Sequence, residues 1–568
     1  MRWTLKPKPD PKKVKALQEA IKVDAVVARL LLQRGIETYD QAKTFFRPEL
    51  SELHDPFLMR DMEKAVDRIE QAINDDENIL IYGDYDVDGT TAVALMFSYL
   101  SSYYSKVATY IPDRYEEGYG ISIKGIDFAD DNGFSLIIAL DCGIKALDQV
   151  AYANSKGIDF IICDHHRPGD QLPEAYAILD PKRTDCDYPF KELCGCGVGF
   201  KLIQALESNR GRSIDFLVPY LDLVVTAIAA DIVPVSGENR ILAYYGMQVI
   251  NDSPRTGIKA ILDQQKKAVF TITDLVFTVA PRINAAGRIQ HGNYAVELLS
   301  EKDQDNARLA AEQIDGFNSE RKDLDKEITK QALQLIEDSR EKDKYTSVVF
   351  QSHWHKGVLG IVASRLIETY YRPTIVLTQD GEKLTGSARS VKGFDIYNAL
   401  SECDDLLEKF GGHKYAAGLT MNIQHFEDFK ARFEKVVAER ISEHLRVQEI
   451  LIDAEINIRD INPRLHRILS QFAPFGPDNM TPVFMSRDLF DTGYARPVGE
   501  DGDHLKLAVV QGNNSQQINA IGFNLGHKYE MVGNRKKFMA AFTIDENHWN
   551  GRIDLQLKLK DIKQDLKI

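Results

Sequence analysis

The sequence predicts an α/β protein whose first large domain is built on a parallel β-sheet. Between residues 51 and 295, short apolar stretches alternate with helical stretches, as in proteins whose helices cross over between parallel strands. Several of these apolar stretches end in acidic residues or histidine. Apolar residues also recur at helical spacing over 300–340 and at every second position near residue 555, which predicts a long helix and a β-rich domain.

The composition is ordinary for a globular protein of several domains. The chain has 568 residues, of which 44% are hydrophobic and 27% charged. It has no apolar run of 18 residues, no apolar signal core at the start, and only six cysteines, so we expect a cytoplasmic protein without membrane contact. The net charge of −15 argues against coating nucleic acid by bulk charge, but it leaves room for a local basic groove.

The N-terminal residues 1–50 are expected to form a small helical cap and an arm. A helix is predicted at Ala25–Leu32, with Gly35 as its stop. The sheet domain is expected to span 51–295. Its strands are predicted at Ile79–Tyr82, Val107–Ile111, Leu136–Leu140 and Phe160–Cys163.

Three aspartates follow the first of these strands at alternate positions: Asp84, Asp86 and Asp88. In extended chain, alternate side chains point the same way, about 6.5–7 Å apart. The three carboxylates are therefore expected to form one row, which cations or arginines must hold together. An EF-hand is disfavoured because Leu95 stands where its loop needs Glu, and because a strand precedes the motif. A solvated acidic turn seldom follows so apolar a strand, so we expect a divalent-metal site.

Polar side chains also follow later apolar elements: Asp141, Asp164, His165, His166 and Asp231. Because the carboxyl ends of parallel strands share one edge of a sheet, we expect the residues after strands to converge, and we expect Asp231 to join them. Each alone is weak, since a single Asp after a strand is more often a helix cap and a His pair is more often structural. Together, oxygens and imidazole suit two Mn²⁺ or Mg²⁺ ions, with imidazole favouring Mn²⁺.

A connecting helix is predicted over 296–342, where no proline interrupts the helical repeat of apolar residues. A second α/β domain is expected over 343–447, with strands at Ser347–Phe350 and Pro373–Leu377. Its polar, glycine-rich segments are interpreted as loops: Trp354–Gly357, Gly386–Ser390 and Gly411–Gly418. Such loops can offer backbone N–H groups and Arg389 to a phosphate, and ordinary turns are the alternative.

The last segment, 448–568, is predicted to be a small β-barrel. Apolar residues alternate strictly in two places, Leu505–Val509 and Ile553–Leu559. A barrel with Lys, Tyr and Trp side chains can bind a single strand of nucleic acid. A barrel with no binding role has the same composition, so both interpretations stand.

Several motifs resemble those of the DHH phosphoesterase family: Gly83–Thr91, Ala139–Gly143 and Asp164–His166. Gly386–Ser390 and Gly411–Gly418 resemble the associated DHHA1 domain. Within the family, the chain is similar to bacterial single-strand-specific exonucleases over nearly its whole length, through Trp3–Leu5, Arg34–Ile36, His54–Asp61, Pro281–Arg288 and Phe472–Pro477. The resemblance implies a DHH parallel-sheet domain, a connecting helix, a DHHA1 domain and an OB-like barrel. It also implies stepwise 5′→3′ hydrolysis of single-stranded DNA to 5′-mononucleotides in recombination and repair.

The resemblance further implies roles for single residues. The implied metal ligands are Asp86, Asp88, Asp141, His165 and Asp231, with Asp84 as a further ligand or a supporting partner. His166 is expected to contact the phosphoryl oxygens, and Asp164 to orient a histidine.

The implied substrate-binding residues are Arg114, Tyr119, Arg282, Asn284, Arg288, Ser387, Arg389, Gly411, Gly412 and His413. Among them, Ser387 and Arg389 would hold the 5′ phosphate, helped by Arg282 or Arg288. Arg114 and Tyr119 would stack on bases or exclude them.

By resemblance, the expected partners are single-stranded DNA, a single-strand-binding protein and a RecQ-type helicase. The nearest alternative is a DHH phosphodiesterase acting on short oligonucleotides or cyclic dinucleotides, which usually lacks the barrel and the N-terminal arm. A non-catalytic DNA-binding scaffold of this family has lost metal carboxylates that this chain retains. An inorganic pyrophosphatase has neither this length nor the phosphate-binding domain.

Overall fold

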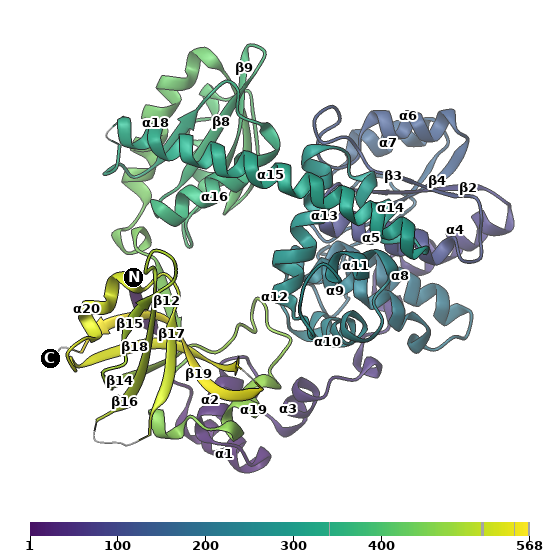
Figure 1. Ribbon diagram of the computed structural model, residues 1–568. Helices are drawn as coiled ribbons and strands as arrows, with labels where there is room; N and C mark the ends of the chain where they lie inside the picture. Colours follow the sequence, from purple (N-terminus) through teal and green to yellow (C-terminus); the bar gives the residue numbers. More distant parts are fainter. Residues whose placement is uncertain (340, 513–515, 550, 566–568) are drawn as a thin grey trace.

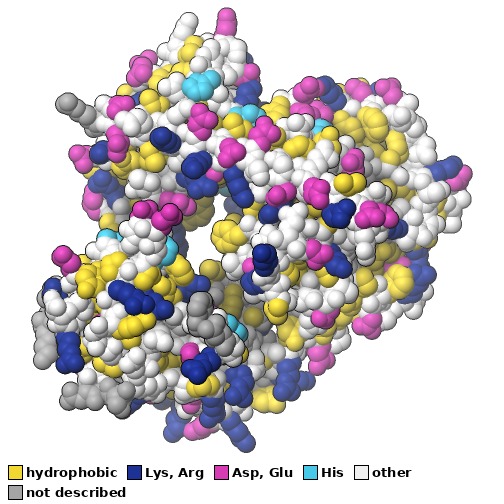
Figure 2. Space-filling model, viewed as in Figure 1, with side chains coloured by type: hydrophobic (Ala, Val, Ile, Leu, Met, Phe, Trp, Pro, Cys, Tyr) yellow, Lys and Arg dark blue, Asp and Glu magenta, His cyan; other side chains and the backbone are white. Residues whose placement is uncertain are grey.

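The computed structural model describes residues 1–339, 341–512, 516–549 and 551–565. The chain forms three bodies (Figure 1). The space-filling view shows a central opening between them, with Lys and Arg side chains along part of its rim (Figure 2). Within the described residues, no helix is both long and apolar enough to cross a membrane.

The first body is built on a five-stranded parallel sheet in the order β3-β2-β4-β5-β6. The four predicted strands are present, and β6 is an addition to them. Residues of β2 alternate between two cores, with Ile79 and Ile81 packing on one face and Leu80 and Tyr82 on the other. Both faces are covered, as parallel sheets require. The strands are β2 Asn78–Gly83, β3 Val107–Tyr110, β4 Phe134–Leu140, β5 Asp159–Cys163 and β6 Ala177–Leu179.

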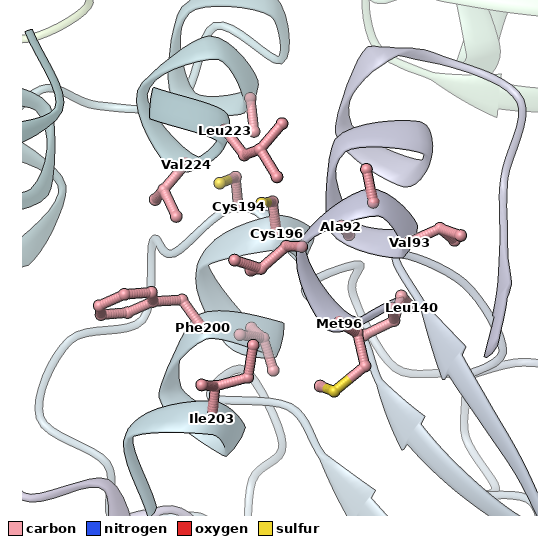
Figure 3. Packing of buried hydrophobic residues seen from close by; sticks show 14 of the residues in the cluster. Ala92, Val93, Met96, Leu140, Cys194, Cys196, Phe200, Ile203, Leu223 and Val224 are labelled. Atoms are coloured by element: carbon pink, nitrogen blue, oxygen red, sulfur yellow. The ribbon is translucent and has the colours of Figure 1, made fainter. Parts of the chain in front are cut away.

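Helices cover both faces of this sheet. On one face, α5, α8 and α9 pack through Met96, Phe200 and Leu223 (Figure 3). On the other face lie α6 and α7, which contribute Ile126 and Val150 to the second core. The helices of this body are α4 Met62–Asn74, α5 Val87–Leu100, α6 Ile123–Asp131, α7 Leu147–Ser155, α8 Gly195–Asn209, α9 Leu221–Ala230, α10 Gly237–Asp252, α11 Thr256–Leu262, α12 Ile272–Asp274, α13 Ala280–Ile289 and α14 Asn293–Ser300.

Helix α15, Gln304–Asp338, is the predicted connecting helix. Its first half contributes Ala311 and Ile314 to the core of the first body. Its second half contributes Ile328 and Ile336 to a cluster of the second body. One continuous helix therefore fixes the two bodies relative to each other.

The second body has a mixed sheet in the order β10-β11-β9-β8-β7, in which only β7 and β8 are parallel. Here one prediction was wrong. Gly386–Ser390 and Gly411–Gly418 do not form loops, because most of their residues lie in β9 and in the hairpin of β10 and β11. Glycine favours turns in general, but it is also accepted where strands pass closely. The elements are β7 Ser347–Phe350, α16 Leu359–Thr369, β8 Thr374–Asp380, β9 Lys383–Arg389, α17 Ile396–Ser401, β10 Lys409–His413, β11 Ala416–Asn422 and α18 Phe426–Arg440.

The third body is a closed β-barrel. Its sheet runs β13-β14-β18-β19-β17-β16-β15, and the extra pairing of β14 with β16 closes five strands into a ring, as in an OB fold. The elements are β12 Glu449–Ile452, β13 Ala454–Glu455, α19 Pro463–Ser470, β14 Phe484–Asp491, β15 Arg496–Val498, β16 His504–Gln511, β17 Ile518–Gly522, α20 Tyr529–Val532, β18 Phe538–Trp549 and β19 Arg552–Gln564.

The N-terminal residues belong to this third body in packing terms. Leu30 and Phe45 share one core with Phe472, Leu507 and Phe542. The first strand also pairs in parallel with β12. The division of the chain into five segments stays a prediction, but the first segment is packed against the last. These N-terminal elements are β1 Arg2–Leu5, α1 Pro11–Ile21, α2 Ala25–Leu32 and α3 Tyr39–Phe46.

Candidate metal centre and phosphate pocket

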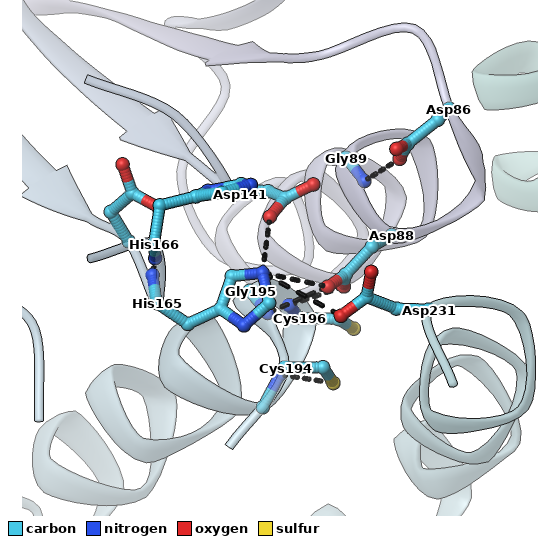
Figure 4. Close-up of polar contacts among 12 residues, drawn as sticks. Asp86, Asp88, Gly89, Asp141, His165, His166, Cys194, Gly195, Cys196 and Asp231 are labelled. Atoms are coloured by element: carbon cyan, nitrogen blue, oxygen red, sulfur yellow. Dashed lines mark hydrogen bonds and ion pairs between the residues drawn. The ribbon is translucent and has the colours of Figure 1, made fainter. Parts of the chain in front are cut away.

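The three motif aspartates do not form the predicted row. Strand β2 ends at Gly83, and Asp86 is already the N-cap of α5, where its carboxylate accepts the Gly89 N–H at 3.1 Å. Asp is among the best N-cap residues, so a helix begins where extended chain was expected. Asp84 and Asp88 are buried, whereas Asp86 is half-buried and turned toward Gly89 (Figure 4).

Gly89 lets this helix start directly against the strand end. A Cβ atom at position 89 would lie 2.4 Å from the carbonyl oxygen of Asp84. Only glycine therefore permits the first turn of α5 to lie over the end of β2. The result is a helix N-terminus, with its partial positive charge, beside the carboxylates.

His165 is the centre of the cluster. Its Nε2 lies 3.2 Å from Asp141 Oδ1, 3.6 Å from Asp231 Oδ2 and 3.8 Å from Asp88 Oδ2 (Figure 4). These residues come from the ends of β4 and β5, the first turn of α5 and the end of α9. These side chains therefore converge at the carboxyl edge of the sheet, as expected, and Asp231 lies among them.

Asp164 and His166 form a second pair beside the cluster. Asp164 is buried and accepts a hydrogen bond from His166 Nδ1 at 2.8 Å, as well as backbone N–H groups including that of Ile144 at 2.9 Å. The other ring nitrogen of His166 lies 3.2 Å from the Tyr119 hydroxyl. His413, from β10 of the second body, stacks at 6.5 Å on His166. The two bodies therefore meet at this histidine.

Burial, and after it charge repulsion, disfavours the ionised form of these carboxylates. Burial, and then the negative charge of neighbouring aspartates, raises the pKa values of Asp84, Asp88 and Asp141 well above their ordinary value. Burial also raises the pKa of Asp231 to about 7. The positive charges of Arg114, near Asp84, and of His166 and Lys182, near Asp231, oppose these shifts without cancelling them.

The two adjacent histidines are shifted in opposite directions. Burial, helped by the charge of His166, lowers the pKa of His165 to about 3. Burial also opposes protonation of His166, but the hydrogen bond and charge of Asp164 outweigh it and raise the pKa of His166 to about 9. At neutral pH, the His165 imidazole is thus uncharged and can ligate a cation, whereas the His166 imidazole is protonated and can donate hydrogen bonds.

The donor set fits hard divalent cations. Asp141, His165 and His166 offer ligand atoms within 4.8 Å of one another, and so do Asp88, His165 and Asp231. Asp141 Oδ1 is buried and accepts no hydrogen bond from the described residues. Carboxylate oxygens with a neutral imidazole suit Mn²⁺ and Mg²⁺, and divalent cations would remove the repulsion.

The implied substrate-binding residues fall into two groups. Arg114, Tyr119, Asn284 and Arg288 line one cavity of about 240 Å³ together with Asp84, Asp86, Asp88 and Asp231. Arg114 lies over the Tyr85 ring at 4.1 Å. This cavity therefore joins the carboxylates to positively charged side chains.

The second group lies on the sheet of the second body. Arg389 Nη1 donates to Ser387 Oγ at 2.8 Å, and a Cβ at Gly360 would lie 2.5 Å from Arg389 Nη2, so glycine makes room for the guanidinium. Arg288 lies near enough for the charges of Arg114 and Arg389 to help burial lower its pKa to about 9. Within the described part of the chain, Arg114, Arg288 and Arg389 form no ion pair, whereas Arg282 pairs with Asp315 at 2.9 Å. The geometry thus brings Arg288 rather than Arg282 to Arg389.

Gly411 and Gly412 lie in β10, beside His413. A Cβ at Gly412 would lie 2.3 Å from the Ala416 carbonyl oxygen, and its φ of +144° also favours glycine. A Cβ at Gly411 meets no atom within 4 Å among the described residues. Gly412 therefore shapes the hairpin that carries His413 to the cluster.

Two features escaped the sequence analysis. Asp180 follows β6 at the same sheet edge, and burial raises its pKa to about 7. The apolar run Ala177–Leu179 was the available signal. The backbone N–H groups of Gly195 and Cys196 donate hydrogen bonds to Asp88. Gly195 is 107 positions from Asp88 in the sequence, so no local pattern could predict this contact.

Three stretches of the chain match known domain families. These are the DHH family N-terminal domain over 78–228, the DHHA1 domain over 342–439 and the RecJ OB domain over 452–561. The fold and the carboxylate cluster thus define a DHH protein with a DHHA1 domain and an OB domain.

Relatives narrow this class. The single-stranded-DNA-specific exonuclease RecJ of Bacillus subtilis is 38% identical over 99% of this chain and 70% of its own length. The RecJ of Escherichia coli is 34% identical over 88% of this chain and 90% of its own length. A crystal structure of RecJ in complex with Mn²⁺ from Thermus thermophilus superposes with a TM-score of 0.85 at 26% identity, covering 100% of this chain and 80% of that one. A Mg²⁺ complex from the same organism gives 0.79 at 25% identity, covering 100% and 79%. The chain belongs to the RecJ family.

Proposed function

We propose that the chain is a metal-dependent exonuclease specific for single-stranded DNA, which works 5′→3′, releases 5′-mononucleotides and serves recombination and repair. The observation that carries the proposal is the carboxylate and imidazole cluster, whose Asp88 and Asp231 line one cavity with Arg114, Asn284 and Arg288. The names of the RecJ relatives support the substrate. The Mn²⁺ and Mg²⁺ complexes support the cofactor.

Asp88, Asp141, His165 and Asp231 would hold the cations, with His165 common to both groups of ligand atoms and with Asp84 and Asp86 beside them. When bound, two such cations supply a hydroxide nucleophile and neutralise charge on the phosphate. The protein contributes fixed ligands, which the N-terminal turns of α5 and α8 and the strand ends hold in place.

His166 would stabilise negative charge on the scissile phosphate. Asp164 keeps it protonated at neutral pH and fixes its ring through the 2.8 Å bond to Nδ1. Nε2 is left for the Tyr119 hydroxyl or for a phosphoryl oxygen. Asp164 acts through His166 and is a positioning residue.

Arg389, Ser387 and Arg288 would bind the 5′ phosphate and so select the end of the strand. Arg288 also ties the two bodies together, because its Nη1 donates to the Gly357 carbonyl at 2.8 Å. Within the first body, its own carbonyl accepts the Tyr115 hydroxyl. A bridge of this kind would limit the width of a strand that passes between the two bodies. Such a limit would favour single strands over duplexes.

The deciding experiment uses one long single-stranded DNA labelled at either end, incubated with the purified protein and Mn²⁺. We expect the 5′ label to leave at once as a mononucleotide, while the 3′-labelled strand shortens gradually. Asp141→Asn should lose at least about a hundredfold in rate, because it removes a ligand charge. Asp148→Asn, an exposed aspartate of α7, is the matched control. Cleavage of a dinucleotide but of neither long strand would instead indicate the small-substrate phosphodiesterase.

End recognition has its own test. The protein should hydrolyse a 5′-phosphorylated strand faster than a 5′-hydroxyl strand, and Arg389→Ala should remove most of that difference. Lys392→Ala, an exposed cation just after β9, should preserve it. An unchanged preference in Arg389→Ala would place the 5′-phosphate site elsewhere.

We extend the proposal to two partners, a single-strand-binding protein and a RecQ-type helicase. What supports it is the substrate itself, since single strands arise by unwinding and are coated in the cell. Adding both purified partners to a duplex should permit its degradation by this protein. If neither partner increases degradation of the duplex, the two partners have to be dropped from the proposal.

A further inference from the structure

The N-terminus of α8 touches two of the candidate metal ligands at once. The Gly195 N–H donates to Asp88 Oδ2 at 2.7 Å, and the Cys196 N–H donates to Asp88 Oδ1 at 2.7 Å. All three residues are buried. Both oxygens of the Asp88 carboxylate are thus oriented by one helix, whose terminus carries partial positive charge.

The same glycine lies against Asp141. A Cβ atom at position 195 would lie 2.4 Å from Asp141 Oδ1, 2.5 Å from its Cβ and 2.7 Å from its Cγ. The three nearest atoms therefore all belong to one side chain, and they include its least movable atom. Gly195 therefore donates a hydrogen bond to Asp88 (Figure 4). The space that a side chain at position 195 would need is already occupied by Asp141.

Asp141 cannot easily move away. Its backbone has φ +60°, a conformation that is uncommon outside glycine. Its N–H donates to the Cys163 carbonyl at 2.8 Å, and its carboxylate faces His165 Nε2 at 3.2 Å. A side chain at position 195 would have to displace the carboxylate of Asp141 or withdraw α8 from Asp88.

We infer that Gly195 is a positioning residue that sets the separation of the Asp88 and Asp141 carboxylates, and thereby the binding of divalent cations. The inference rests on the metal-dependent activity proposed above. It assigns no chemistry to Gly195 itself. Its effect is geometric, because one atom added here changes the distance between two ligands that come from different elements.

If Gly195 were an ordinary glycine inside a helix, the opposite result would be expected from Gly195→Ala. Alanine in place of glycine inside a helix is normally favourable. Gly197, two residues along α8, is such a position, because a Cβ there would meet its nearest atoms at 3.4–3.5 Å, which is ordinary contact. Gly197→Ala is therefore the matched control for Gly195→Ala.

The first measurement is Mn²⁺ binding to the purified full chain by titration calorimetry, beside the unfolding temperature in EDTA. We expect Gly195→Ala to bind Mn²⁺ at least tenfold more weakly and Gly197→Ala to bind it like the parent. Parent-like Mn²⁺ binding by Gly195→Ala overturns the inference. A parent that binds Mn²⁺ but hydrolyses no DNA would overturn the proposed function and leave the positioning role standing.

A double-mutant cycle covers the case in which Gly195→Ala folds poorly. Asp141→Gly removes the obstructing side chain and suits the positive φ. In the Asp141→Gly background, adding Gly195→Ala should cost little or no unfolding temperature in EDTA, whereas in the parent it should cost several degrees. An equal cost in both backgrounds would show that the added atom meets something other than Asp141, and would overturn the inference.

Discussion

At the scale of single residues, His165 and His166 show how the fold assigns charge to adjacent side chains of one kind. Burial keeps His165 neutral, with a pKa of about 3. The buried Asp164 keeps His166 protonated, with a pKa of about 9. The two rings are 4.7 Å apart, yet one is suited to ligate a cation and the other to face an anion.

Asp164→Asn should move the pH profile of the enzyme. Without the carboxylate, the pKa of His166 falls toward about 6.5, so at pH 8 roughly thirtyfold less of it is protonated. We expect the rate at pH 8 to fall by a comparable factor and to recover as the pH approaches 6. The measurement is the rate of single-strand hydrolysis against pH, with Asp148→Asn as control. A loss of the same size at every pH would show that Asp164 acts in some other way.

The crowded carboxylates make a second prediction, about the metal-free protein. Their pKa values are raised in the folded state, so the folded protein binds more protons than the unfolded chain, and stability falls as pH rises. Above pH 7, the raised pKa of His166 acts in the same direction, because its proton is lost through about 9.

Between pH 7 and 8.5, the unfolding temperature in EDTA should therefore decrease. Mg²⁺ should raise it more at pH 8.5 than at pH 7, because cations replace the lost protons. Scanning calorimetry with and without Mg²⁺ measures both effects. A metal-free unfolding temperature that rises over this range would contradict the charge arrangement described here.

At the scale of elements, the sequence predicted what depends on local pattern. Strands β2 to β5, helix α2 and helix α15 follow from apolar runs and helical spacing, and the shared edge of parallel strands brings Asp141 and His165 together. The role of Asp86 as a helix N-cap was not predicted, because helix capping and extended structure compete over a few residues. The hydrogen bonds from α8 to Asp88 were not predicted, because they join positions that are distant in the sequence. The glycine-rich strands of the second body were not predicted, because glycine alone indicates a turn.

One of those strands allows a direct test. A Cβ at Gly386 in β9 would lie 2.4 Å from the Val376 carbonyl oxygen, whereas at Gly418 in β11 the nearest atom is 3.9 Å away. Gly386→Ala should destabilise the protein by about 1–3 kcal/mol, the usual cost of overpacking. Gly418→Ala should change stability little. Urea unfolding compares the two, and equal midpoints would contradict the close passage of β9 and β8.

At the scale of the whole molecule, Arg240 of α10 joins the first body to the third. Its buried guanidinium donates to the carbonyls of Phe45, Phe472 and Ala473 at 2.8–3.1 Å, and lies 3.8 Å above the Phe45 ring. Burial lowers its pKa to about 10. One side chain thus satisfies carbonyl groups of both chain segments that build the third body.

Arg240→Met should loosen this joint. It leaves buried carbonyls without donors, at a cost of about 1–3 kcal/mol for each group that water cannot reach. We expect a lower urea midpoint and faster proteolysis between the first and third bodies. Arg47→Met, an exposed arginine just after α3, is the control. A variant with parent-like unfolding and proteolysis would show that the joint does not depend on this residue.

The core that α1 to α3 share with the barrel has a consequence for synthesis. Leu17 to Phe45 leave the ribosome early, but their partners, from Ala454 to Ile562, follow roughly 400 residues later, about 20–80 s at 5–20 residues per second. During that interval, the sheet body can fold and its Arg240 can cover the Phe45 ring, while the barrel side chains that share a core with α1 to α3 have not yet been made. These helices can therefore complete their core only after the barrel has been synthesised.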